Sequence, residues 1–435
     1  MSAEPVVTTR RGGDIPHIVD HGVACPTLGG GRLISLDFTR GVAVLGILFA
    51  NIMGMGQPIE TAYGWPGGFL SDHDSFADAL WVVQFVLVDG KMRGLFTLLF
   101  GAGIILFADR AKESGGWASL TVHRLFWLFV FGLAHYYLLW RGDILALYAL
   151  CGVIVLIAID WSWVQQLGAG LTAYFVGSIY HIGVLGPLWV ANETALGRSP
   201  EFAALADSTR AFIEIQLADG KREAAIAAQG SWFEYVRHAA QDHTWNWWDT
   251  FLSSAPETIA LMLIGMALYR AGLFEGRLNR RSQAIWGWVG VTVGIALTAP
   301  IGWWAWHDGF TFTGTALASH GLQSVTRLSM ILGLAALLAL YGPHATGWLG
   351  SRITAAGRAA FTNYIGSSLL MLAVFQGWGL GLFGALTREQ LYLVAIAGCV
   401  LMLMWSQPWL ARFRYGPLEW LWRCLTYRRV FPIAQ

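Results

Sequence analysis

His135 and Asp143 are two titratable side chains within the largely apolar stretch 123–154. A neutral imidazole can remove a proton from a hydroxyl or an amine, and a nearby carboxylate can orient that imidazole. The alternative is structural, with His135 hydrogen-bonded to a neighbouring helix and Asp143 capping its own helix. Titratable groups inside a membrane are costly and usually face a cavity or a partner. The stretch therefore predicts an acid–base pair near one membrane surface.

Five further polar side chains lie within or at the ends of apolar stretches. Asn51 could stabilise an oxyanion or orient an acceptor, or it could hold helices together by hydrogen bonds in lipid. Asp37 and Arg40 are three residues apart and can pair on one helix face, while Arg40 could equally bind a phosphate in a bidentate way. Arg358 and Asn363 open a later apolar stretch, where they suit a nucleotide phosphate or helix capping.

The composition predicts a membrane protein. Of the 435 residues, 55% are hydrophobic and 13% are charged, whereas a soluble domain carries about 25% charged residues. The net charge of +1 points to no acidic partner, and no basic run alternates with aromatics as in a nucleic-acid site. The four cysteines are scattered without a CxxC pair, so we expect no disulfide framework, no zinc site and no metal cofactor.

The apolar stretches predict an all-α fold of about ten transmembrane helices. A helix needs about 20 apolar residues to cross a hydrocarbon core of roughly 30 Å. We expect the spans at 36–55, 92–108, 123–140, 143–160, 164–190, 252–270, 283–306, 323–342, 359–378 and 390–410. The stretch 75–88 is too short to span comfortably, so we expect an interfacial or re-entrant helix on the outer side. Two short spans between 75 and 108 are the alternative.

The charges that flank the spans favour the first topology. With one span between 75 and 108, most arginines at span ends fall on the same side of the membrane. Lys and Arg of short loops concentrate on the cytoplasmic side, so both termini are expected to be cytoplasmic. The predicted organisation is a tail at 1–32, a transmembrane domain at 33–410 and a tail at 411–435. The domain contains an outer loop at 191–250, with helical pieces near 200–217 and 221–228.

Several short motifs, taken together, resemble a known family. They are SLDFTRGVAVLGIL at 35–48 followed by Asn51, LLFGAG at 98–103, GLAH at 132–135, GDIL at 142–145, GRAAFTNY at 357–364 and FRYGPLEWLWR at 413–423. The chain is similar over nearly its whole length to the bacterial YeiB-like family of multispanning membrane proteins. This similarity implies a multi-pass protein of the bacterial inner membrane.

The first span also resembles that of transmembrane acyltransferases such as heparan-α-glucosaminide N-acetyltransferase. The resemblance implies transfer of an acyl group from cytoplasmic acyl-CoA, most simply acetyl-CoA, to a small-molecule or glycan acceptor outside, and it implies a homodimer in the bilayer. Asn51 matches an Asn implicated in that enzyme, whereas His73 is the nearest candidate for its loop His but at a different spacing.

Two further classes of function stay open at this point. In the acyltransferase, Asp37, Arg40, Arg358 and Asn363 would bind the donor, Asn51 would polarise the thioester, and His135 with Asp143 would activate the acceptor. In a proton-coupled transporter, the same intramembrane residues would line a substrate path and relay protons. A membrane subunit without turnover is the third class. Alternating access favours repeated halves, and the chain shows no such repeat, which favours the enzyme.

Overall fold

The computed structural model describes residues 33–58, 75–112 and 116–435, so the predicted tail at 1–32 and His73 lie outside the described residues. Within these ranges the chain is built of helices, joined by short turns. The helices up to the middle of the chain are α1 (Ile34–Gly56), α3 (Ser75–Leu87), α4 (Lys91–Lys112), α5 (Trp117–Leu138), α6 (Leu145–Val155), α7 (Trp163–Glu193), α8 (Pro200–Gln229) and α9 (Trp232–Gln241). They are followed by α10 (Asn246–Ala271), α11 (Arg280–His307), α12 (Phe312–Ala316), α13 (Gln323–Tyr341), α14 (Trp348–Arg358), α15 (Ala360–Phe375), α16 (Arg388–Arg412) and α17 (Pro417–Tyr427).

The membrane-spanning character predicted from the sequence is confirmed. Eight helical stretches in the described ranges are long and apolar enough to cross a membrane, with α3 and α4 forming a single stretch. The shorter apolar helices Leu145–Ala158 and Ala360–Phe375 coincide with the two remaining predicted spans. The turn 88–90 separates α3 from α4. Both alternatives, an interfacial or re-entrant helix and two short spans, contain this break, so the position of α3 in the membrane stays a prediction.

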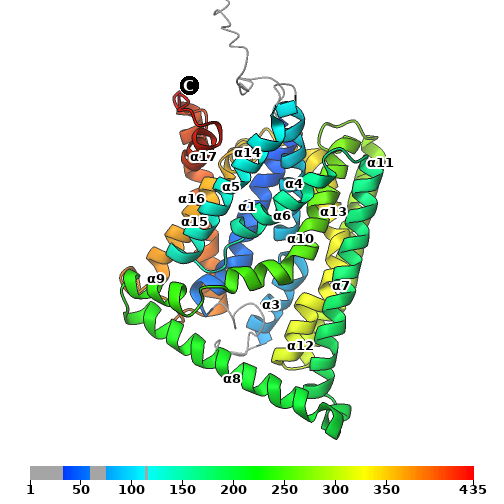
Figure 1. The fold of residues 1–435 in the computed structure, drawn as a ribbon, viewed down its shortest axis with the longest axis vertical. Helices are drawn as coiled ribbons and strands as arrows, with labels where there is room; N and C mark the ends of the chain where they lie inside the picture. Colours follow the sequence, from blue (N-terminus) through cyan, green and yellow to red (C-terminus); the bar gives the residue numbers. More distant parts are fainter. Residues whose placement is uncertain (1–32, 59–74, 113–115) are drawn as a thin grey trace, which may run out of the picture.

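Different helices cover the two ends of the helical bundle. Figure 1 shows α17 and the C-terminus at one end, and α8 crossing the opposite end. We call these the α17 end and the α8 end. At the α17 end, the first turn of α1 lies beside the residues that follow α10. The Ser35 hydroxyl donates there to the Phe274 carbonyl across 2.5 Å.

Two segments outside the spans are more ordered than the sequence indicated. The region expected to hold two helical pieces forms one helix of 30 residues, α8, which runs through Leu217 and Lys221 without a break. The segment expected as a C-terminal tail folds into α17, and the Trp422 indole donates to the Arg124 carbonyl of α5 across 2.9 Å. Both helices are fixed by packing against the bundle, which local sequence patterns do not report.

Side chains at the centre of the bundle are buried, whereas helices at its rim expose large apolar side chains. The α4 and α10 helices supply many of the most buried side chains, such as Leu98 and Ile264. Large apolar side chains are exposed on α7, α11 and α16, for example Ile179, Trp286 and Leu393. Exposed apolar faces of this extent are typical of surfaces that contact lipid.

Candidate functional site

His135 and Asp143 meet inside the molecule, together with a hydroxyl from a distant helix. His135 is 1% exposed. Its Nδ1 lies 2.9 Å from Asp143 Oδ1, and its Nε2 lies 2.8 Å from Ser368 Oγ on α15. If the carboxylate is ionised and the imidazole neutral, Nδ1 donates to Asp143 and Nε2 accepts from the Ser368 hydroxyl. A hydroxyl, an imidazole and a carboxylate are thus aligned in hydrogen-bond contact, the order in which a nucleophile, a base and an orienting group are arranged in many enzymes.

Close packing of α5 against α6 brings this histidine to its carboxylate. At Gly132, one turn before His135, an added Cβ would lie 2.3 Å from the backbone nitrogen of Ala146. Only glycine permits that approach in a helix–helix contact. Asp143 Oδ2 also accepts from the Ala146 N–H at 2.8 Å, at the start of α6. Asp143 therefore orients His135 and caps its own helix at once.

A cavity of about 980 Å³ enters the bundle from the α17 end. Side chains of α1, α4, α5, α6, α14, α15 and α17 line it. On α4 the lining residues run from Ala111 to Phe96, which corresponds to roughly 22 Å at 1.5 Å per residue. The cavity thus extends through much of a hydrocarbon core about 30 Å thick. Ligand sites in proteins commonly have volumes of about 300–1,000 Å³.

The wall of this cavity changes from basic to apolar along its length. The described residues contribute six arginines and two acids, namely Arg40, Arg110, Arg124, Arg358, Arg414, Arg423, Asp37 and Glu419. Further in, the wall is made of side chains such as Leu125, Leu128 and Leu145. A site with this gradient suits a ligand with an anionic head and an apolar arm.

Several of the arginines are held in place by aromatic rings. The Arg124 guanidinium lies 3.8 Å from the centre of the Trp422 ring, and that of Arg423 lies 4.8 Å from the centre of the Tyr415 ring. Stacking orders a guanidinium plane and leaves its N–H edges for an anion. The Arg423 Nε is buried and makes no hydrogen bond within the described part of the chain.

Glu419 of α17 has a structural role at the mouth of the cavity. Its carboxylate accepts from the backbone N–H groups of Phe361 and Thr362 at 2.7 and 3.1 Å, and from the Thr362 hydroxyl at 2.6 Å. It therefore caps the start of α15 from a distant helix. Burial raises the pKa of the Glu419 carboxyl, although these hydrogen bonds oppose the shift.

His135 lies between this cavity and a second, smaller pocket near the α8 end. Tyr364, whose ring centre is 5.1 Å from that of His135, lines the large cavity. Ser368, the partner of His135 Nε2, lines the small pocket, whose volume is about 20 Å³. Trp140, Glu223 and Tyr235 also line the small pocket. His135 itself is not among the described residues that line either space, but it contacts one lining residue of each.

The residues predicted to bind a donor fall into two groups. Asp37 and Arg40 form an ion pair at 3.6 Å, and both line the cavity together with Arg358. Asn363 lies elsewhere, since its amide nitrogen donates to the Ala356 carbonyl at 3.0 Å and the Ser406 hydroxyl at 3.1 Å. Its oxygen accepts from the Trp405 indole at 2.8 Å. This buried amide joins α14, α15 and α16, so we leave Asn363 out of the proposed site.

Asn51 is half-buried on α1 and is not among the described residues that line either space. It lies one turn from Gly54, whose carbonyl accepts from the Trp140 indole at 3.0 Å. This contact places the end of α1 beside the turn that follows His135. The role of Asn51 stays a prediction.

A buried charge cluster was not anticipated from the sequence. Glu257 of α10 pairs with Arg93 of α4 at 2.7 Å and with Arg327 of α13 at 2.6 Å. Glu257 and Arg327 both lie inside predicted spans, so their charge at that position is a signal that could have identified them. Ser368 and Tyr364 carry no such signal, because hydroxyls are common in membrane helices and only the fold brings them to His135.

Comparisons with known proteins identify the family of the chain. The family described as "Protein of unknown function (DUF418)" matches residues 268–429. YeiB of Escherichia coli K12, an uncharacterized protein, is 30% identical over 408 residues, covering 92% of this chain and 98% of that protein. YxaH of Bacillus subtilis, also uncharacterized, is 28% identical over 430 residues, covering 94% of this chain and 98% of that protein. No solved structure matches. The chain therefore belongs to the YeiB-like family of multi-pass membrane proteins.

Proposed function

We propose that this protein is a transmembrane acyltransferase that takes an acyl group from acyl-CoA at the α17 end and delivers it to an acceptor at the α8 end. The observation that supports this best is the position of His135 between the arginine-lined cavity and the small pocket. A catalytic base that contacts a lining residue of each space can serve a donor and an acceptor that arrive from opposite sides. The arginines gathered at the α17 end favour the cytoplasmic side for that end.

The cavity fits the chemistry of a coenzyme A thioester. Its phosphates would bind the guanidinium groups near the mouth, among them Arg40, Arg358 and Arg423. Its long arm would follow the apolar wall toward Tyr364 and Leu145. The thioester would then lie beside His135. Acetyl-CoA is the simplest donor that satisfies this arrangement.

Ser368 is the hydroxyl that His135 is positioned to activate, because the two side chains are 2.8 Å apart. In the proposed reaction, Ser368 Oγ attacks the thioester carbonyl while its proton passes to His135 Nε2. The carbon–sulfur bond breaks, and the leaving thiolate takes that proton to give free CoA. An acceptor hydroxyl or amine then loses its proton to His135, takes the acyl group, and Ser368 regains its proton. Asp143 stabilises the imidazolium that forms in each step.

The transporter remains a second candidate, and the cluster of Arg93, Glu257 and Arg327 favours it. Charged groups that pair inside a membrane often mark a path for ions or substrates. None of the three lines the cavities within the described residues. They join three helices at the centre of the bundle, which equally suits a structural role.

An acceptor-free experiment tests the enzyme without knowledge of the acceptor. The purified protein in lipid nanodiscs is mixed with acetyl-CoA, and free CoA thiol is followed with time. We expect a burst of about one thiol per chain, with an acetyl group on the peptide that contains Ser368. The His135→Ala and Ser368→Ala variants should lose the burst, slowing release by about 10²–10⁴-fold.

The matched control is His307→Gln, which removes an exposed histidine whose Nδ1 contacts only its own helix, at the Trp303 carbonyl. This variant should keep the burst. Bound acetyl-CoA without any thiol release would contradict the acyl-serine step, and a protein that neither binds nor consumes acetyl-CoA would direct attention to the transporter.

A further inference from the structure

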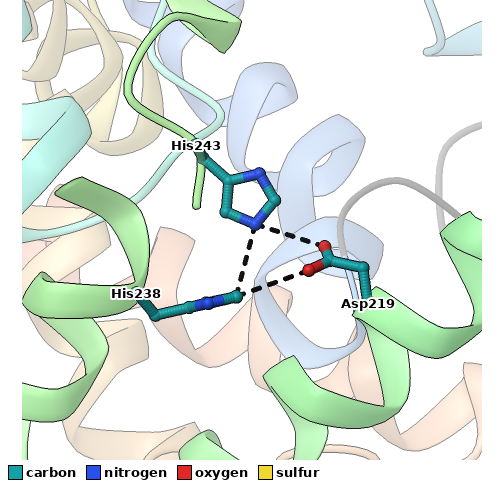
Figure 2. Close-up of side chains that lie close together, drawn as sticks. All are labelled: Asp219, His238 and His243. Carbon is teal, nitrogen blue, oxygen red and sulfur yellow. Dashed lines mark hydrogen bonds and ion pairs between the residues drawn. The ribbon is translucent and has the colours of Figure 1, made fainter. Parts of the chain in front are cut away.

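Three potential metal ligands converge at the α8 end, away from His135. Asp219 comes from α8, His238 from α9, and His243 from the segment that joins α9 to α10. Figure 2 shows the two imidazole rings and the carboxylate directed at one another. The two Nε2 atoms are 3.3 Å apart, His243 Nε2 lies 3.2 Å from Asp219 Oδ2, and His238 Nε2 lies 3.9 Å from Asp219 Oδ1.

These separations match the edges of a tetrahedral zinc site. Zinc binds His nitrogen and carboxylate oxygen at about 2.0–2.2 Å in tetrahedral geometry, which places neighbouring ligand atoms about 3.3 Å apart. The distances between pairs of ligand atoms, 3.2, 3.3 and 3.9 Å, therefore leave space for one ion among the three atoms. The two histidines are 3% and 7% exposed, so the site is largely shielded from solvent.

The far side of each imidazole has the partner that a metal-bound histidine needs. His238 Nδ1 lies 2.8 Å from Asp242 Oδ2. The Nδ1–H group donates a hydrogen bond to this carboxylate, so Nε2 carries no proton and can coordinate a metal. The amide nitrogen Nδ2 of Asn246 lies 3.0 Å from His243 Nδ1. Rotation of this amide by 180° would turn its oxygen to Nδ1, which would then donate a hydrogen bond to it and leave the second Nε2 to coordinate.

The electrostatics agree with this geometry. Burial lowers the pKa of His238, although the hydrogen bond to Asp242 opposes the shift. The neutral imidazole is the form of histidine that binds metal.

We propose that Asp219, His238 and His243 bind a divalent transition-metal ion, and the distances between their ligand atoms identify zinc as the ion that fits. The fourth position is open on the side of Asp219, whose side chain is 21% exposed. Two imidazoles and one carboxylate suit zinc, whereas magnesium and calcium require oxygen ligands. The ion would join α8, α9 and the segment before α10 into one unit. That unit contacts α5, because the Tyr136 hydroxyl donates to the His243 carbonyl at 2.8 Å.

Metal analysis of the full chain tests this proposal. The protein is purified through an affinity tag without histidines and without chelators, and its metals are measured by plasma mass spectrometry. We expect about one zinc per chain, as three protein ligands provide. Removing the ion with a chelator should lower the Tm, and zinc should restore it while magnesium and calcium should not.

Variants separate this site from adventitious binding. Asp219→Asn and His243→Gln should lose the zinc, and Asp242→Asn should weaken its binding by about 10–100-fold through its effect on His238. His307→Gln should keep one zinc. Wild-type protein that holds no zinc and is not stabilised by added zinc would overturn the proposal, and so would zinc that the variants retain. If a variant fails to fold, titration of the wild-type protein alone decides.

Discussion

The carboxylate of Asp143 uses both of its oxygens, one for His135 and the other for the Ala146 N–H. Catalysis and helix capping, which the sequence left as alternatives, are therefore compatible in one side chain. The same holds for His135, which contacts a neighbouring helix through Ser368. Substitutions of Asp143 that keep one of these two hydrogen bonds and remove the other can therefore test the two roles separately.

Asp143→Asn and Asp143→Ala should differ in stability and agree in activity. The Asn side chain keeps an oxygen for the Ala146 N–H, whereas Ala loses the cap at a cost of about 1 kcal/mol. Neither side chain carries the charge that stabilises protonated His135, so both should reduce acetyl-CoA-dependent thiol release by at least about 100-fold. Thermal unfolding and thiol release measured on the same preparations check both statements. An active Asn variant would show that Asp143 serves only as a cap.

At the scale of helices, three paired charges join α4, α10 and α13 at the centre of the bundle. Glu257 neutralises two guanidinium groups from different helices, those of Arg93 and Arg327. Arg327 is 5% exposed. A buried ion cluster adds little stability as a whole, but the loss of one member leaves a charge without compensation.

Glu257→Gln should therefore destabilise the protein by up to about 3–5 kcal/mol, because the buried Arg327 and the partly exposed Arg93 then lack a counter-ion. Thermal unfolding in one detergent measures the change. Glu201→Gln, in the exposed first turn of α8, is the matched control and should change stability by less than about 0.5 kcal/mol. Equal stability of the two variants would contradict the structural role and favour a mobile, substrate-linked Glu257.

The helices differ in how much the sequence could predict about them. Spans such as α1 and α16 were predictable, because a bilayer demands a long apolar helix whatever its neighbours are. The continuous α8 was not, since its polar sequence gains stability from packing against the bundle. The pairing of His135 with Asp143 followed from their closeness along the chain. The contact with Ser368 did not, because 233 residues separate it from His135.

The cavity and the metal ligands were likewise not predictable, because they are formed by residues far apart in the chain. Arg40, Arg124 and Arg423 come from three distant helices, and only the packed bundle places them around one space. Asn363 was predicted for this group from its place beside Arg358, yet its side chain points into a helix contact. A search for cysteine pairs could not find Asp219, His238 and His243. The two histidines have the H-x4-H spacing of many zinc sites, but no cysteine pair accompanies them, and only the fold brings Asp219 to them.

At the scale of the whole molecule, the two ends have different chemistry. The α17 end holds the mouth of an arginine-lined cavity, and the α8 end carries the small pocket and the proposed metal site. His135 lies between them. This asymmetry is what a protein needs if it receives a charged donor on one side of a membrane and serves an acceptor on the other.

The most direct test is the binding of acetyl-CoA to the purified protein, measured by its effect on thermal stability. A ligand at about 100 times its Kd adds roughly 2.7 kcal/mol to the native state. We predict stabilisation by acetyl-CoA that Arg40→Ala and Arg423→Ala remove, that His135→Ala keeps, and that Arg277→Ala, outside the cavity, leaves unchanged. No stabilisation of the wild-type protein by any CoA thioester, or equal stabilisation of the cavity variants, would contradict the account.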